Sequence, residues 1–305
     1  MAGLSNGVNS SNEHIEQNME VLIYGFVRSI NLVLIAVGFS FAYGVSRLPN
    51  FAHGAFYILS GFATWIFISN LGINYVLSII VSLIILATIG AAMYRFIFIH
   101  IRGMEISEII ASYALGVAIL EALRTRFVGT GFTNPTFIEG TVKIAGVPID
   151  FQRLIMIGAG VVLVGMVWLF THYSKVGLSM RGMAQDERAA LMLGIDSDLT
   201  ASVALATGSA LAALAALIIL PLGNITVNEG YEVLINALAV CIIGGLGSWA
   251  GTILAAFFLG FAGMITATYI GSNWEAVVTV IAIILVLIFR PSGLLARQKE
   301  LEERV

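Results

Sequence analysis

The chain has 305 residues, of which 59% are hydrophobic and 11% are charged, and its formal net charge is −3. Soluble domains carry roughly 25% charged residues, so this composition excludes a water-soluble globular protein, and the small net charge without a basic stripe argues against nucleic acid as a partner. The single cysteine, Cys241, excludes an internal disulfide or a thiolate metal site. The composition therefore indicates a protein whose solvent is lipid.

Long uncharged runs predict an all-α, polytopic bundle of transmembrane helices, because a spanning helix needs about 20 mostly apolar residues. Residues 1–18, which are rich in Ser, Asn and Gly, predict a disordered tail. The membrane domain then covers 19–295, and 296–305 form a second tail. We expect about eight or nine crossings, in the segments 20–46, 51–94 divided at 70–74, 109–120 with its flanks, 154–171, 199–228, 233–274 divided at 244–248, and 276–289.

Basic residues predict which loops lie in the cytoplasm, since Lys and Arg in short loops favour that side. Four basic residues follow Phe289 and place the C-terminus inside. Counting back through nine crossings places residues 174–198 inside and the N-terminus outside. Arg28 is the one basic residue within a predicted span, and we expect its side chain to extend outward.

The longest predicted outer loop covers residues 129–150. It has β-forming residues over 137–144, around Glu139-Gly140, which favour a short hairpin. A simple connector without strands is the alternative.

A compact polar segment interrupts the apolar chain between residues 174 and 198 and is too polar to enter lipid. We predict a short surface helix from Gln185 to Leu193. Asp186 and Glu187 suit the positive N-terminal end of such a helix, and Gly194 suits the position just after its C-terminus. An ordinary interfacial loop helix is the alternative to a functional element.

Polar residues within the predicted spans are few. Asn50 follows Leu48-Pro49 and can cap the next helix. His53 lies one turn further, and no acidic partner stands at helical spacing, which favours a neutral packing histidine over a proton relay. Asn236 shares a helix face with Glu232, an arrangement that fits either polar guidance of a solute or a solvated helix start.

Gly244, Gly245 and Gly247 fall within four residues, and each glycine weakens a helix by about 1 kcal/mol relative to alanine. They predict a turn or re-entrant break beside a translocation path. The candidate path residues are accordingly Asn50, His53, Asn236, Gly244, Gly245 and Gly247. The sequence has no Walker-type phosphate loop and no His/Cys spacing for a metal.

Four motifs resemble the branched-chain amino acid (high-affinity leucine, isoleucine and valine) permease family of ABC importers. Arg188–Gly194 is similar to the Glu-Ala-Ala-x-x-x-Gly loop of importer permeases, although Arg188 stands where the motif has glutamate and Glu187 comes one place earlier. The acidic contact is therefore open between Asp186 and Glu187. The other three motifs are Asn50-Phe51-Ala52-His53-Gly54, Gly244-Gly245-Leu246-Gly247-Ser248 and Arg290-Pro291-Ser292-Gly293-Leu294.

The resemblance implies a permease subunit of the plasma (cell inner) membrane that moves branched-chain or related small amino acids or amides inward by alternating access. It is not an enzyme and holds no cofactor, because two separate ATPase subunits would bind ATP and magnesium. The other implied partners are a second permease subunit in a heterodimer and an extracytoplasmic amino-acid-binding protein. Coupling to the ATPase is assigned to Gln185, Asp186, Glu187, Arg188, Ala189, Ala190 and Gly194.

Two other functions remain open from the residues. An ion-coupled secondary transporter usually has ionisable groups near the bilayer midplane, and this sequence has few carboxylates there. A passive channel for a small neutral solute would leave the polar segment at 174–198 unexplained.

Overall fold

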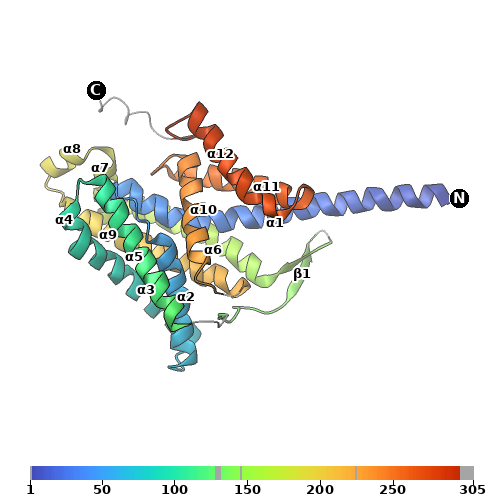
Figure 1. Ribbon diagram of the computed structural model, residues 1–305, viewed down its shortest axis with the longest axis horizontal. Helices are drawn as coiled ribbons and strands as arrows, with labels where there is room; N and C mark the ends of the chain where they lie inside the picture. Colours follow the sequence, from blue (N-terminus) through green and yellow to red (C-terminus); the bar gives the residue numbers. More distant parts are fainter. Residues whose placement is uncertain (1, 128–131, 145, 224, 296–305) are drawn as a thin grey trace.

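The computed structural model describes residues 2–127, 132–144, 146–223 and 225–295. It is a nearly all-α polytopic bundle (Figure 1), which confirms the predicted fold class. Within the described ranges, seven helices are long and apolar enough to cross a membrane, and one shorter apolar helix accompanies them. The chain is therefore a multi-pass membrane protein. The elements are α1 (Ala2–Ser46), α2 (His53–Ser69), α3 (Tyr75–Met93), η1 (Tyr94–Phe98), α4 (Ile99–Ile101), α5 (Glu105–Arg126), β1 (Thr141–Ile144), β2 (Val147–Asp150), α6 (Phe151–Tyr173), α7 (Lys175–Gln185), α8 (Glu187–Met192), α9 (Ser197–Ile219), η2 (Leu220–Leu222), α10 (Glu229–Gly244), α11 (Trp249–Tyr269), η3 (Ser272–Trp274) and α12 (Glu275–Phe289).

Each predicted apolar segment contains one α-helix, and both predicted breaks are present. The break at 70–74 separates α2 from α3, and the break at 244–248 separates α10 from α11. α2 has 17 residues and α10 has 16, so each is only about 25 Å long, less than the roughly 30 Å of hydrocarbon. We call these two helices partial spans, whereas the 15-residue α12 reaches a spanning length of 18 residues together with η3.

The helical backbone of α1 runs through residues 2–18, where the composition predicts a disordered tail. α1 forms the long straight axis of the molecule, with the N-terminus extending beyond the other helices (Figure 1). The domain boundaries at residues 18 and 295 stay predictions.

The centre of the bundle is built by α1 and α9, whose most apolar windows are 67% and 61% buried, whereas that of α12 is 6% buried. Lipid is as apolar as a core side chain, so helices in a bilayer associate through close packing of small residues. α1 and α9 meet in this way, since a Cβ added to Gly38 would lie 3.0 Å from the Gly208 carbonyl oxygen. Buried alanines, including Ala204 and Ala212, continue the small face of α9.

Contacts between distant segments define two ends of the bundle. At the α7–α8 end, the Arg47 Nη2 donates to the Ala184 carbonyl at 3.3 Å, and the Leu294 amide donates to the Ile243 carbonyl at 2.8 Å. At the hairpin end, the Tyr24 hydroxyl donates to the Pro148 carbonyl at 2.7 Å. The segments predicted to be cytoplasmic therefore lie together, away from the predicted outer loop.

The predicted outer loop contains a hairpin, but its position differs from the prediction of 137–144. β1 pairs antiparallel with β2, and the turn between them contains Gly146, whose φ is +88°. Val147 and Ile149 of β2 are buried, so the alternation of apolar residues continues past Gly146. The strand pairing therefore extends to Asp150, which pairs with Thr141. Gly140 lies before the first strand.

The Arg28 guanidinium pairs with the Glu275 carboxylate at the start of α12, and its expected outward extension stays a prediction. Gly263 makes room for this pair, since a Cβ there would lie 3.0 Å from the Arg28 Cζ. The two side chains are 37% and 21% exposed. The pair therefore connects α1, the central helix, to α12, the least buried span.

Glu275→Gln is expected to lower the free energy of unfolding by about 1 kcal/mol, because it leaves the Arg28 guanidinium without its counter-charge in a half-exposed site. Thermal unfolding of the detergent-solubilised protein measures this. Glu121→Gln is the matched control, since Glu121 pairs with Arg124 at 2.9 Å on the same helix and both side chains are more exposed. An equal shift for the two variants would show that the α1–α12 pair adds nothing.

Candidate functional site

The polar segment folds into two short helices, α7 and α8, with Asp186 between them. The predicted helix over 185–193 is therefore wrong at its start, and Gln185 is the last residue of α7. Asp186 has an extended backbone, with φ −156° and ψ 103°, and its carboxylate accepts the Ala189 amide at 3.0 Å, so it caps α8. Gly194 has φ +81° and follows the helix as predicted.

Most residues of the predicted coupling surface are exposed. Of the seven, Gln185, Asp186, Glu187, Arg188, Ala189 and Gly194 are exposed, and Ala190 is buried. Two neighbouring apolar side chains are also exposed, Met192 at 90% and Leu193 at 82%. Exposed apolar side chains at the polar end of a membrane protein are covered either by another protein or by the bilayer interface.

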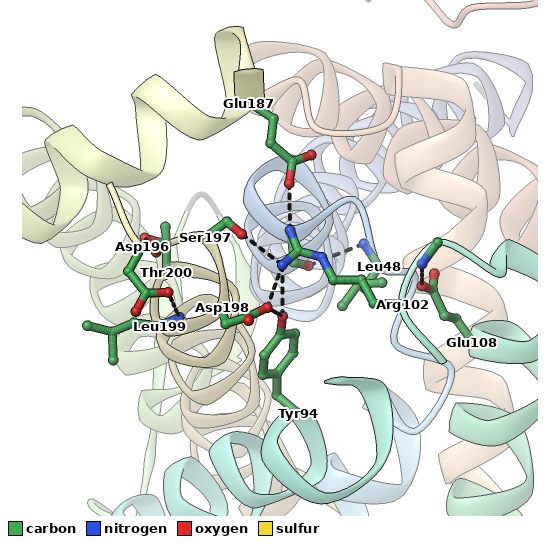
Figure 2. Close-up of polar contacts among 12 residues, drawn as sticks. Leu48, Tyr94, Arg102, Glu108, Glu187, Asp196, Ser197, Asp198, Leu199 and Thr200 are labelled. Carbon is green, nitrogen blue, oxygen red and sulfur yellow. Dashed lines mark hydrogen bonds and ion pairs between the residues drawn. The ribbon is translucent and has the colours of Figure 1, made fainter. Parts of the chain in front are cut away.

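Arg102 brings α8 into contact with the body of the bundle (Figure 2). Its Nη2 donates to the Glu187 carboxylate at 2.6 Å, and its Nη1 donates to the Asp198 carboxylate at 2.5 Å. We call these residues, with Tyr94 and Ser197, the Arg102 cluster. Nη1 also donates to the Ser197 hydroxyl at 2.8 Å and to the Tyr94 hydroxyl at 3.2 Å.

The cluster is held by residues from four segments. The Tyr94 ring is buried, and its hydroxyl donates to the Asp198 carboxylate at 2.6 Å. Asp198 is in the first turn of α9, where a carboxylate is favoured by the helix dipole. Burial acts to lower the pKa of the Arg102 guanidinium, but Tyr94, Asp198 and Glu187 outweigh it and raise the pKa above its usual range. The guanidinium is therefore always charged.

The local fold of residues 94–108 places Arg102. α3 passes into the π-helix η1 and then the single turn α4, and the chain leaves helical geometry at Arg102, with ψ 134°. Gly103, with φ +86°, lets the chain reverse, and its amide donates to the Glu108 carboxylate at 2.8 Å. The Arg102 side chain is thereby turned toward α8 and α9 (Figure 2).

Sequence reasoning missed the Arg102 cluster. No pattern in the chain joins positions 94, 102, 187 and 198. The one available signal was an acidic residue in the first turn of a helix, two residues after its cap, as in Asp196-Ser197-Asp198. This signal indicates the start of a helix but does not predict which residue pairs with Asp198.

Asn50 and His53 lie together at the start of α2, and both are buried. The Asn50 side chain accepts the Ala52 amide at 3.0 Å, so it forms a turn before the helix, while the N-cap position is Ala52. The His53 Nε2 lies 2.9 Å from the Ile35 carbonyl, and its ring packs edge-on against Phe39 at 5.8 Å. This geometry agrees with a packing histidine that joins α2 to α1.

Gly244, Gly245 and Gly247 lie together at the end of α10 and form the predicted turn. Gly245 and Gly247 have φ of +98° and +78°, which other residues rarely adopt. At Gly244 an added Cβ would lie 2.4 Å from the Gly251 backbone, so packing against α11 requires glycine there. Asn236 is half-buried on α10. A role for these residues in translocation stays a prediction.

Among the described residues, no cluster of three or more His, Cys, Asp or Glu side chains could hold a metal ion.

Comparison with known proteins identifies relatives over most of the chain. Residues 21–288 match the family model described as "Branched-chain amino acid transport system / permease component". The high-affinity branched-chain amino acid transport system permease protein BraD of Pseudomonas aeruginosa is 28% identical over 295 residues, covering 92% of this chain and 96% of BraD. LivH of Escherichia coli K12, with the same description, is 25% identical over the same shares.

A solved structure shares the fold. The structure described as PsaBC from Streptococcus pneumoniae in complex with Fab superimposes with a TM-score of 0.50 at 13% identity, covering 96% of this chain and 99% of that chain. At this identity the likeness concerns the helical architecture.

Proposed function

Since this chain belongs to the family of permease components of branched-chain amino acid transport systems, we propose that it is a pore-forming subunit of an ATP-driven importer of leucine, isoleucine, valine or a related small amino acid or amide. The observation that carries the proposal is the family match over residues 21–288, which includes every long helix of the bundle. The relatives BraD and LivH are described as permeases of this transport system.

In the proposed importer, two separate ATPase subunits supply the energy by closing around ATP. α8 and the exposed pair Met192 and Leu193 form the surface that such a subunit covers. Because α7 follows α6 after a break at Ser174, and α8 leads into α9, movement of this surface changes the position of α6 and of the central span α9. The bundle then alternates between outward-facing and inward-facing arrangements.

The orientation follows from the same assignment. The α7–α8 end faces the cytoplasm, together with the C-terminus, and the hairpin end faces outward in the cell inner membrane. The N-terminus is then extracytoplasmic. A separate binding protein delivers the amino acid at the hairpin end, and a second, related permease subunit completes the path. The basic residues in the short loops support this orientation.

Reconstitution tests the proposal. The chain, its companion permease and the ATPase subunits are placed in proteoliposomes with the binding protein and radiolabelled leucine. We expect uptake only with ATP and all subunits present. Leucine uptake by the chain without ATPase subunits would instead support an ion-coupled transporter or a channel.

A further inference from the structure

α8 is held weakly by packing. It has six residues, and Ala190 is its one buried side chain. Asp186 and Leu193 at its ends are exposed. A helix this short has little stability of its own, so it needs polar contacts if its movement is to reach the rest of the bundle.

Arg102 supplies such a contact through one rigid group. The two terminal nitrogens of its guanidinium are divided, with Nη2 on Glu187 of α8 and Nη1 on Asp198 of α9 (Figure 2). A guanidinium is planar, and its donors hold fixed angles to one another. A displacement of Glu187 therefore rotates or shifts the whole guanidinium, and this moves Nη1 relative to the Asp198 carboxylate.

The other side of the cluster is a segment with irregular helical winding. Tyr94, which bonds to both Arg102 and Asp198, is the first residue of η1, a π-helical stretch at the end of α3. π-helical turns are rare and are frequent at functional sites. Two spans, α3 and α9, thus end at the same guanidinium.

Stability alone does not account for the cluster. The Glu187 and Asp198 side chains are 48% and 51% exposed, and ion pairs between solvated groups contribute little to folding. Yet the cluster joins a helix on the surface to α3, which is far from it in sequence, and to the start of α9, which follows it closely.

We propose that Arg102 is a positioning residue that transmits the movement of α8 to α3 and α9 through its divided contacts with Glu187, Asp198 and Tyr94. This inference rests on the proposed function, because it requires an ATPase subunit that moves α8. It differs from the proposed function, however, because it concerns the contact through which the movement of α8 reaches the spans.

The test is the ratio of leucine transported to ATP hydrolysed in the reconstituted complete importer. Arg102→Gln is expected to lower this ratio about tenfold, the size expected when a charged hydrogen bond is lost, while ATP hydrolysis continues because the exposed surface of α8 is unchanged. Glu187→Gln should lower it in the same direction. The double variant should be no worse than Arg102→Gln alone, because both changes break one connection. Arg102→Lys should recover part of the ratio.

Arg95→Gln is the matched control. Arg95 is an exposed arginine in η1, one residue after Tyr94. Within the part of the chain that the structure describes, its side chain makes no hydrogen bond, and it acts on the Asp198 carboxylate through its charge alone. Its ratio should fall far less than that of Arg102→Gln, because a charge without a hydrogen bond does not transmit a displacement. If Arg102→Gln fails to assemble, Asp198→Asn decides, since Asp198 accepts the other half of the guanidinium and lies outside the surface assigned to the ATPase.

The possible results distinguish the role of Arg102 from the transport function on which that role rests. An unmodified importer without ATP-dependent uptake would overturn the proposed function. ATP-dependent uptake with an unchanged ratio in Arg102→Gln and Glu187→Gln would overturn only the role of Arg102. A parallel loss of ATP hydrolysis and uptake would also overturn it, since Arg102 would then serve assembly.

Discussion

Replacing Met192 and Leu193 together with aspartate is expected to abolish ATP-driven leucine uptake and the capture of ATPase subunits. The two side chains are 90% and 82% exposed and adjacent to the turn at Gly194. If a partner covers them, each behaves as an apolar anchor whose removal costs about 2 kcal/mol. Together the two changes weaken the complex by about three orders of magnitude. Co-purification of the ATPase subunits and uptake in proteoliposomes measure the effect.

Leu71→Asp is the control for this double variant. Leu71 is also an exposed leucine, at 62%, and it lies between α2 and α3 near Tyr75. The Tyr75 ring contacts Phe137 of the outer loop at 5.0 Å, so Leu71 is at the hairpin end. Capture should be unchanged in this variant. Full capture by the Met192/Leu193 double variant would show that α8 does not bind the ATPase.

The helices were predictable because lipid imposes a simple requirement on the sequence. Every backbone group of a span has to be satisfied within the segment, so length and hydropathy alone find helices such as α1 and α9. The breaks were also predictable, because the polar run at 70–74 and the glycines at 244–247 oppose helix continuation. The side of the membrane on which each end lies remains a prediction.

Boundaries in polar segments were predicted less well, because several residues there can begin or end a helix. α8 begins at Glu187 and is capped by Asp186, since a carboxylate that accepts an amide two or three residues ahead favours an extended backbone. The hairpin was displaced for a similar reason, because both Gly140 and Gly146 can form a turn and the apolar alternation decides between them.

The tertiary partners of charged residues were not predictable from a single sequence. Arg28 and Glu275 are 247 positions apart, and Arg102 and Asp198 are 96 apart. Local spacing rules, which join residues three or four apart on a helix, cannot relate such positions. The Arg102 cluster therefore emerges only when the helices are assembled.

Gly54→Ala is expected to lower the free energy of unfolding by about 2 to 3 kcal/mol, the range of a severe overpacking change. A Cβ at Gly54 would lie 1.9 Å from the carbonyl oxygen of Gly230, so the starts of α2 and α10 would have to separate. Uptake should fall as well, since Asn50 and His53 lie at this start of α2. Thermal unfolding in detergent and leucine uptake measure the two effects.

Gly158→Ala separates this steric effect from the general effect of adding a methyl group to a helical glycine. Gly158 is exposed on α6, and nothing lies within 4 Å of an added Cβ. Alanine there should raise stability by up to about 1 kcal/mol, because it improves helix propensity without a clash. Opposite signs at positions 54 and 158 are therefore expected. Equal stabilisation at both would mean that α2 and α10 do not approach through Gly54 and Gly230, and the packing of the two partial spans would have to be different.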